Sequence, residues 1–260
     1  MNIPELQGNL SHSNFFIYAA ADPVYFDSYA RPLIKSIQAN APNYGCHIHI
    51  YNPRPDQLEF CQRHSVSHTW EQVTGFDQVA QKWLTRSVFN NERQRQMYSK
   101  GQTMGIAQLR QLVANTYYAC MRFVRLAQIL PQGQKCLSLD VDGLVRRKFS
   151  HELGNCDFYL YEKPKDHSHL AGAILFNGTN GSTDFLNQYA TELRNSIDAD
   201  DLYWFLDQVV LDHIVPQYKK GLLPMSYIDW SMADSSAIWS AKGKRKDLAV
   251  FVNELKKYNS

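Results

Sequence analysis

The chain has 260 residues, of which 44% are hydrophobic and 13% aromatic, so it can bury a full core and disorder over most of its length is excluded. Its 27 basic and 25 acidic residues leave a formal net charge of +2, which is too balanced for a surface that coats nucleic acid. The amino terminus lacks a signal-peptide pattern, and no uninterrupted apolar stretch reaches the ~18 residues of a membrane-spanning helix.

The first part of the chain alternates strand and helix signals. Residues 15–21 (FFIYAAA) predict a strand that ends at Asp22-Pro23. Apolar residues at helical spacing predict a helix within 28–42, and the alternating residues 46–51 predict a second strand. A strand, a helix and a strand at this spacing imply two parallel strands joined by a right-handed crossover.

The rest of the chain continues the same mixture with a less regular start. Residues 56–105 mix aromatic and charged residues with weak periodicity, which predicts irregular structure with short helices. The pattern strengthens over 115–130, where a helix is predicted that ends at Pro131. Further strands, helices and a basic run are predicted in this order: strands 136–139, 157–162 and 171–177, helices 184–197 and 201–215, the basic run 242–246, and a last short segment at 247–255.

These elements predict a single α/β domain over residues 1–260, with a mostly parallel central sheet flanked by helices. No internal repeat, low-complexity tract or linker interrupts the chain. Its five cysteines are scattered, odd in number and never in a C-x-x-C pair, so we expect reduced thiols in a cytoplasmic protein and neither disulfides nor a zinc site. The sequence leaves a homo-oligomer open.

Two aspartates, Asp140 and Asp142, follow the strand predicted at 136–139. Side chains alternate along an extended segment, so both carboxylates point the same way while Val141 points opposite. Ligands bind at the carboxyl ends of strands in an open α/β sheet, and paired carboxylates without a nearby cysteine suit Mg²⁺ or Mn²⁺. The alternative is a solvated turn, because aspartate is common where strands end.

Two groups of cations could act beside this aspartate pair. Arg122 and Arg125 lie three residues apart on the preceding helix, and a guanidinium is well shaped for phosphate oxygens. Several cations flank Gly243 within 242–246, a segment that could close over a diphosphate. The alternatives are a locally paired helix face for the arginines and a solvated basic tail for the second group.

Five segments in order resemble the GT-A glycosyltransferases, and specifically the glycogenin and galactosyltransferase-like group called family 8. The resemblance runs from about residue 17 to 246 and implies a GT-A fold, with a nucleotide-binding half at about 14–145 and an acceptor and closing half at about 146–250. It is carried by AADPVY (20–25), MRFVRLAQILPQGQKCLSLDVDGLV (121–145), AGAILFN (171–177), DQVVLD (207–212) and SAKGKRK (240–246).

The resemblance implies a hexosyltransferase that moves a hexose from a UDP-sugar to a hydroxyl of a carbohydrate or other acceptor, with retention of anomeric configuration. Mn²⁺ or Mg²⁺ on Asp142, together with Lys246, would stabilise the departing diphosphate, and Asp140 would bind the metal indirectly or a ribose hydroxyl. Asp207 and Gln208 would stand at the reacting sugar or the acceptor hydroxyl. The resemblance assigns the donor to Ala20, Asp22, Tyr25, Arg122, Asp140, Gly172, Gly243 and Lys246.

The chain departs from the family pattern at two positions. Ser240 stands where the family uses a histidine as third metal ligand, and a hydroxyl is a poorer ligand for Mn²⁺ than an imidazole. Leu170 stands where a polar residue is usual, which leaves the sugar open. His169 and His213 are candidate substitute ligands, although a lone histidine near an apolar helix is more often structural.

Other classes of function remain alternatives at this stage. A catalytically silent nucleotide-sugar binding protein is one, because Ser240 removes a metal ligand. A scaffold is another, since the aromatic-rich region 56–118 could bind a partner or form the acceptor wall. A nucleotidyltransferase would carry a glycine-rich basic loop after the first strand, where Asp22 to Tyr25 stand instead.

Overall fold

The computed structural model describes residues 2–86 and 92–259. Within these ranges eight strands form one sheet, in the order β1-β4-β3-β2-β5-β8-β7-β9, and two more form a small sheet, β10-β6. The strands of the large sheet are β1 (Gln7–Asn9), β2 (Phe15–Ala21), β3 (Gly45–Tyr51), β4 (Ser67–Glu71), β5 (Lys135–Leu139), β7 (Phe158–Glu162), β8 (His169–Phe176) and β9 (Lys220–Leu222). Those of the small sheet are β6 (Gly143–Val145) and β10 (Ile238–Ser240).

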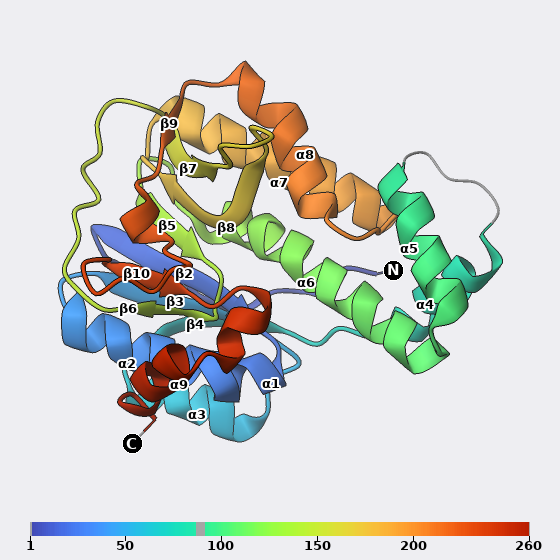
Figure 1. Ribbon diagram of the computed structural model, residues 1–260, viewed down its shortest axis with the longest axis horizontal. Helices are drawn as coiled ribbons and strands as arrows, with labels where there is room; N and C mark the ends of the chain where they lie inside the picture. Colours follow the sequence, from blue (N-terminus) through green and yellow to red (C-terminus); the bar gives the residue numbers. More distant parts are fainter. Residues whose placement is uncertain (1, 87–91, 260) are drawn as a thin grey trace.

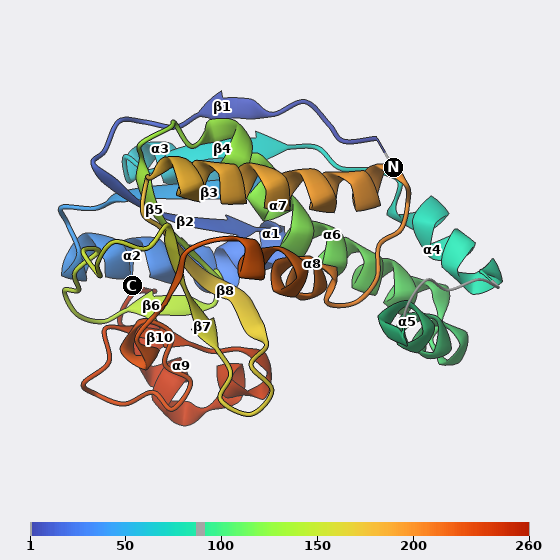
Figure 2. The ribbon, with the colours of Figure 1, turned by 90° about the horizontal axis from the view of Figure 1, so that it is seen from above.

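Helices cover both faces of the large sheet (Figures 1 and 2). In Figure 1, α2 and α3 lie below the sheet, while α6, α7 and α8 lie on its other side. The α-helices are α1 (Pro23–Tyr25), α2 (Arg31–Asn40), α3 (Pro55–Arg63), α4 (Phe76–Thr85), α5 (Glu92–Thr103), α6 (Ile106–Ile129), α7 (Asn180–Asp198), α8 (Leu206–Ile214) and α9 (Ala249–Lys256). A π-helical stretch, η1 (Phe26–Ala30), joins α1 to α2, and short 3-10 turns are η2 (Val215–Gln217), η3 (Met225–Tyr227) and η4 (Gly243–Asp247).

The large sheet is mixed in direction. Its β4-β3-β2-β5 part is parallel, which includes the parallel pair β2-β3 that the sequence predicted. Strand β8 then runs antiparallel to both β5 and β7, and β1 is antiparallel to β4 at the far edge. The fold is therefore α/β with a large central sheet between helices, and β2 and β5 end side by side at its centre.

Strand β2 shows how the sequence builds this centre. Phe15 and Ile17 pack with the cluster under α2 and α3, whereas Phe16 and Tyr18 pack with α6 and α7 on the other face. The strand stops at Asp22, whose Oδ1 accepts a hydrogen bond from the Tyr25 backbone N at 2.8 Å and so caps α1. Proline at the first helical position fits this cap, so the Asp22-Pro23 pair ends the strand and begins the helix.

The structure corrects the prediction in the middle of the chain. The segment predicted to be irregular, 56–105, holds the strand β4 besides α3, α4 and α5. Strand β4 escaped the prediction because its buried positions carry Thr69 and Glu71 in place of apolar residues. Helix α6 begins at Ile106, well before the predicted 115, because Leu109 and Val113 extend its buried face by two turns.

Helix α8, in contrast, begins later than the sequence predicted. It begins at Leu206, after the predicted start at 201, because Phe205 adopts a left-handed backbone conformation with φ 66° and interrupts the helical pattern. All five cysteines are free thiols, as predicted. Within the described ranges, no helix is both long and apolar enough to cross a membrane.

Candidate functional site

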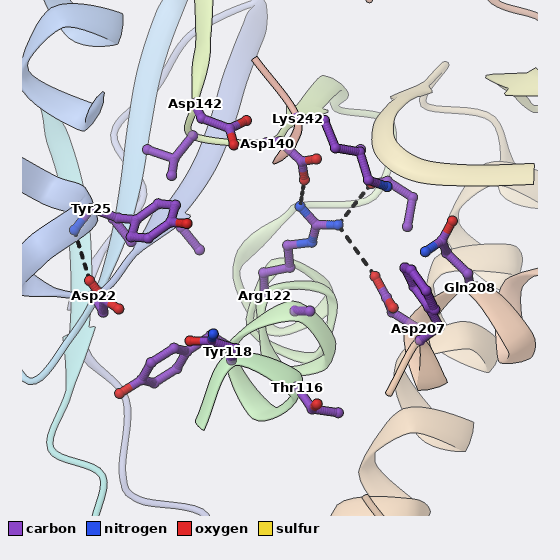
Figure 3. Close-up of a pocket in the computed structure, with 18 of the residues that line it drawn as sticks. Asp22, Tyr25, Thr116, Tyr118, Arg122, Asp140, Asp142, Asp207, Gln208 and Lys242 are labelled. Carbon is purple, nitrogen blue, oxygen red and sulfur yellow. Dashed lines mark hydrogen bonds and ion pairs between the residues drawn. The ribbon is translucent and has the colours of Figure 1, made fainter. Parts of the chain in front are cut away.

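A cavity of about 410 Å³ opens at the carboxyl ends of β2 and β5 (Figure 3). Its wall comes from these strand ends, from α6, from β8, from the first turn of α8 and from the segment after β10. The cavity brings together the residues that the family resemblance assigned to the donor, the metal or the reaction: Ala20, Asp22, Tyr25, Arg122, Asp140, Asp142, Gly172, Asp207, Gln208, Gly243 and Lys246.

Arg122 links two of the carboxylates across the floor of the cavity. Its Nη1 donates to Asp140 Oδ1, and its Nη2 lies 3.6 Å from Asp207 Oδ2 and donates to the Ala171 carbonyl at 2.9 Å. Figure 3 shows the guanidinium between the two aspartates. The arginine side chain is only 10% exposed, so it can fix the separation of Asp140 and Asp207 rigidly.

Gly172 creates the space that Asp140 occupies. Strand β8 pairs with β5, and the Asp140 backbone N donates to the Gly172 carbonyl at 2.7 Å. A Cβ added to Gly172 would lie 2.7 Å from Asp140 Oδ2, which is closer than real Cβ atoms approach. The carboxylate beside Gly172, and not an unusual backbone angle, therefore favours a glycine at this position, because any larger residue would displace Asp140.

Asp142 pairs with a lysine from the other end of the chain. Its Oδ2 lies 2.8 Å from Lys246 Nζ, which also donates to the Tyr25 hydroxyl at 2.8 Å and lies 4.4 Å from the centre of that ring. The Ala241 backbone N donates to the Asp142 carbonyl at 3.1 Å, so the segment after β10 is tied to the aspartate pair. Lys246 thus joins the aspartate pair, by an ionic contact, to Tyr25 at the start of the chain, 221 positions away, by a hydrogen bond.

Burial and neighbouring charges set the protonation of these carboxyl groups. Burial opposes ionisation of Asp140, but Arg122 and then Lys242 outweigh it and hold the pKa of Asp140 below its usual value. Burial raises the pKa of Asp142, and the negative charge of Asp140 adds to the rise. Burial also raises the pKa of Asp207, against the opposing effect of Arg122.

The wall also contains Lys242 of the basic run and Tyr118 of the aromatic-rich region, and Figure 3 shows Lys242 pointing into the cavity beside Asp140. Sequence reasoning missed Trp204 and Phe205, which add aromatic surface. The four-residue spacing of Lys242 and Lys246 was a signal in the basic run, since two residues at that spacing can share one side of a turn. For Phe205 the sequence carries no signal, because its position depends on its unusual backbone angle.

Three other candidates lie elsewhere. Arg125 does not line the cavity, because its guanidinium is buried against Glu71 on another side of α6. His169 bonds Asp212 through Nδ1 at 2.7 Å, and His213 is exposed on α8; neither lines the cavity. Arg125 is therefore not placed to bind a phosphate in the cavity, and neither histidine is placed to replace the missing metal ligand.

The aspartate pair fits a hard divalent cation. Oδ1 of Asp142 is buried and has no hydrogen-bond partner among the described residues, which leaves an acceptor for a cation. Ser240 lies in β10 opposite Gly143 and outside the cavity wall, and its buried Oγ has no hydrogen-bond partner among the described residues. In the part of the chain that the structure describes, no group of three or more His, Cys, Asp or Glu side chains is placed to hold a metal.

We compared the chain with protein families, curated proteins and solved structures, and only solved structures are similar to it. No protein-family model and no curated protein matches this chain. Among solved structures, the galactosyltransferase LgtC, determined with donor and acceptor sugar analogues, is 13% identical over 93% of this chain and 95% of its own, with a TM-score of 0.51. The glycosyltransferase GlyE of Streptococcus pneumoniae is 10% identical over 95% of this chain and 63% of its own, with a TM-score of 0.54.

The bifunctional glycosyltransferase WbbM is 13% identical over 96% of this chain, with a TM-score of 0.52. The chain spans 51% of WbbM and 63% of GlyE, less than two thirds of either. At these identities the likeness establishes architecture. The chain has the GT-A fold that these glycosyltransferases share, as the sequence predicted.

Proposed function

We propose that the chain is a glycosyltransferase that moves a hexose from a UDP-sugar to a hydroxyl of a carbohydrate or other acceptor. One observation carries the proposal: in a GT-A fold, a single cavity gathers an aspartate pair, two lysines and the Asp207-Gln208 pair at the carboxyl ends of β2 and β5. Its volume of about 410 Å³ lies within the range of small-molecule sites. Uridine as the base rests on the family resemblance alone.

The chemistry of the donor explains why charges gather here. When the bond between the anomeric carbon and the diphosphate breaks, negative charge develops on the phosphate oxygens. Lys246 would contact these oxygens from the segment after β10. Asp140 and Asp142 would hold Mn²⁺ or Mg²⁺, which when bound offsets the same charge as a Lewis acid. Because Ser240 supplies no ligand at the wall, phosphate oxygens and water would complete the coordination.

The remaining residues would orient the two ends of the donor. Ala20, Asp22 and Tyr25 form the end of the cavity that would receive the base, and Figure 3 shows Asp22 and Tyr25 on the side opposite Asp207 and Gln208. Asp207 and Gln208 would bind the hexose or the attacking hydroxyl. The buried Arg122 contact would hold the sugar end in register with the phosphate end. Retention of the anomeric configuration is part of the proposal.

The test is a panel of UDP-sugars incubated with the protein and Mn²⁺, with UDP release measured before and after a mixture of saccharide acceptors is added. We expect one sugar to release UDP slowly alone and faster with an acceptor, and proton NMR of the product to show the donor's anomeric configuration. Asp142→Asn should abolish release. Asp234→Asn, which removes a carboxylate on a side chain that is 89% exposed, should match the wild type.

The possible results separate the alternatives. UDP that binds without release for any sugar would identify a nucleotide-sugar binding protein that is catalytically silent. Absence of binding by UDP and by all UDP-sugars would refute the proposal. An Asp142→Asn variant that turns over like the wild type would remove the aspartate pair from the mechanism.

A further inference from the structure

The cationic side chains of the cavity differ in whether they already form an ion pair. Three line it among the described residues: Arg122, Lys242 and Lys246. Arg122 is committed to Asp140, and Lys246 is 2.8 Å from Asp142. Lys242 makes no side-chain hydrogen bond or ion pair with any residue that the structure describes, although it is half-buried. An ammonium in that position has been partly removed from water without a compensating carboxylate.

The backbone fixes where this ammonium can reach. Ser240 N donates to the Asp229 carbonyl at 3.0 Å and Ala241 N donates to the Asp142 carbonyl at 3.1 Å, so the chain is anchored just before Lys242. Gly243 then turns with φ 67°, a conformation that favours glycine. Lys242 Nζ lies 5.9 Å from the centre of the Phe205 ring, and Figure 3 shows the side chain entering the cavity on the side of Asp140 that faces Gln208.

Two further observations place the Lys242 charge near the reaction centre. Its positive charge contributes to the lowered pKa of Asp140 and opposes the burial that raises the pKa of Asp142 and of Asp207, so it acts on all three carboxylates. Its neighbour Lys244, in contrast, is exposed and lies outside the cavity wall. One lysine of the basic run is thus aimed inward without a carboxylate partner, while the next faces solvent.

We infer that Lys242 is a phosphate-binding residue of this chain, which contacts the donor diphosphate directly and gives the cavity affinity for the nucleotide even without a divalent cation. The inference rests on the proposed function, since it concerns the same donor. An incoming diphosphate can bind Lys242 without breaking an ion pair, whereas binding to Lys246 or Arg122 competes with Asp142 or Asp140. Lys242 is therefore the first cation available to the anion.

The position also bears on the missing metal ligand. Ser240, two residues earlier, contributes no group to the wall, so this segment brings a positive charge to the cavity in place of a ligand. A charge that contacts the phosphate oxygens stabilises the same developing anion that a metal would stabilise. Lys242 would thus offset part of what a weaker metal site loses.

The test is isothermal titration calorimetry of the full chain with UDP and, separately, with uridine, both in EDTA. We expect Lys242→Gln to weaken UDP binding about ten- to hundredfold, the usual effect of losing a hydrogen bond to a charged group, and to leave uridine binding unchanged. Lys242→Arg, which keeps the charge, should retain most of the UDP affinity. Lys244→Gln makes the same charge change on the exposed neighbour and should leave both ligands unaffected.

The outcomes separate this inference from the proposed function. If the wild type binds UDP and Lys242→Gln binds it equally well, the role of Lys242 is overturned while the proposed function stands. Equal losses for UDP and uridine would also overturn it, because a phosphate contact cannot affect uridine. If the wild type binds no UDP even with Mn²⁺, both the inference and the proposed function fail.

Discussion

Replacing Gly172 with alanine tests whether the cavity depends on the position of Asp140. The new Cβ would lie 2.7 Å from Asp140 Oδ2 and 3.3 Å from Cγ, whereas ordinary contacts begin near 3.4 Å. The carboxylate must therefore retreat by roughly 0.7 Å, the difference between the 3.4 Å limit and the 2.7 Å distance to Oδ2. Because Arg122 holds the other oxygen of Asp140, the retreat strains a buried ionic contact, at about 1–3 kcal/mol, the usual cost of overpacking.

The functional loss should exceed the loss of stability. A shift approaching 1 Å at a positioning residue is enough to slow a reaction about a hundredfold, so we expect UDP-sugar turnover to fall by roughly that factor. The assay is UDP release with Mn²⁺, together with thermal unfolding. Gly105→Ala is the matched control, because a Cβ there meets nothing within 4 Å. Turnover at the wild-type level in Gly172→Ala would refute the claim that Asp140 must keep this position.

Three further changes address separate contacts. Lys246→Met should strengthen Mn²⁺ binding to the nucleotide-free protein about tenfold, because the ammonium no longer competes for Asp142. Electron paramagnetic resonance of Mn²⁺ measures the affinity, and an unchanged affinity would contradict the prediction. Asp207→Asn should slow transfer about a hundredfold yet leave UDP binding intact, and equal losses in both would place Asp207 at the nucleotide instead. Glu71→Gln should lower the free energy of unfolding by about 3 kcal/mol at neutral pH, because it leaves Arg125 buried without its counter-charge. Burial opposes ionisation of Glu71, but its partners outweigh burial and lower its pKa. The stabilisation that ionised Glu71 gives the wild type is therefore present above the usual glutamate pKa and is lost as the pH falls through the lowered pKa. A difference in unfolding free energy between the variants that persists in acid would refute this prediction.

The central strands were predictable because a local run of apolar residues and a clear end signal identify each of them. Strand β2 is apolar along its length, and the Asp-Pro pair that ends it is a recognisable sequence signal for a helix cap and a helix start. Strand β4 was not predictable in this way, since its buried polar groups are satisfied by distant partners. Thr69 bonds His47 at 3.0 Å, and Tyr117 donates to Glu71 at 3.1 Å. A local pattern shows polar residues but not the partners that allow them inside.

The cavity was predictable as a set of residues but not in its contacts. By spacing alone, either Arg122 or Arg125 could reach phosphate oxygens, although the family resemblance favoured Arg122; three residues of helix turn their side chains about 60° apart. That rotation sends Arg122 to Asp140 in the cavity and Arg125 to Glu71 outside it. The basic run posed the same difficulty, because the directions of its lysines depend on the turn at Gly243 and on the anchoring of β10.

The charge balance of the wall argues that Lys242 and a divalent cation act together. Four carboxylates line the described cavity, those of Asp22, Asp140, Asp142 and Asp207, against three cations. A diphosphate entering this wall adds negative charge to an already acidic site, and the single unpaired lysine can offset only part of it. A divalent ion on the aspartate pair offsets more, so the nucleotide and the ion should each raise the affinity for the other. Linkage requires the two increases to be equal, and a UDP affinity that does not change between EDTA and Mn²⁺ would show that the lysines alone balance the diphosphate.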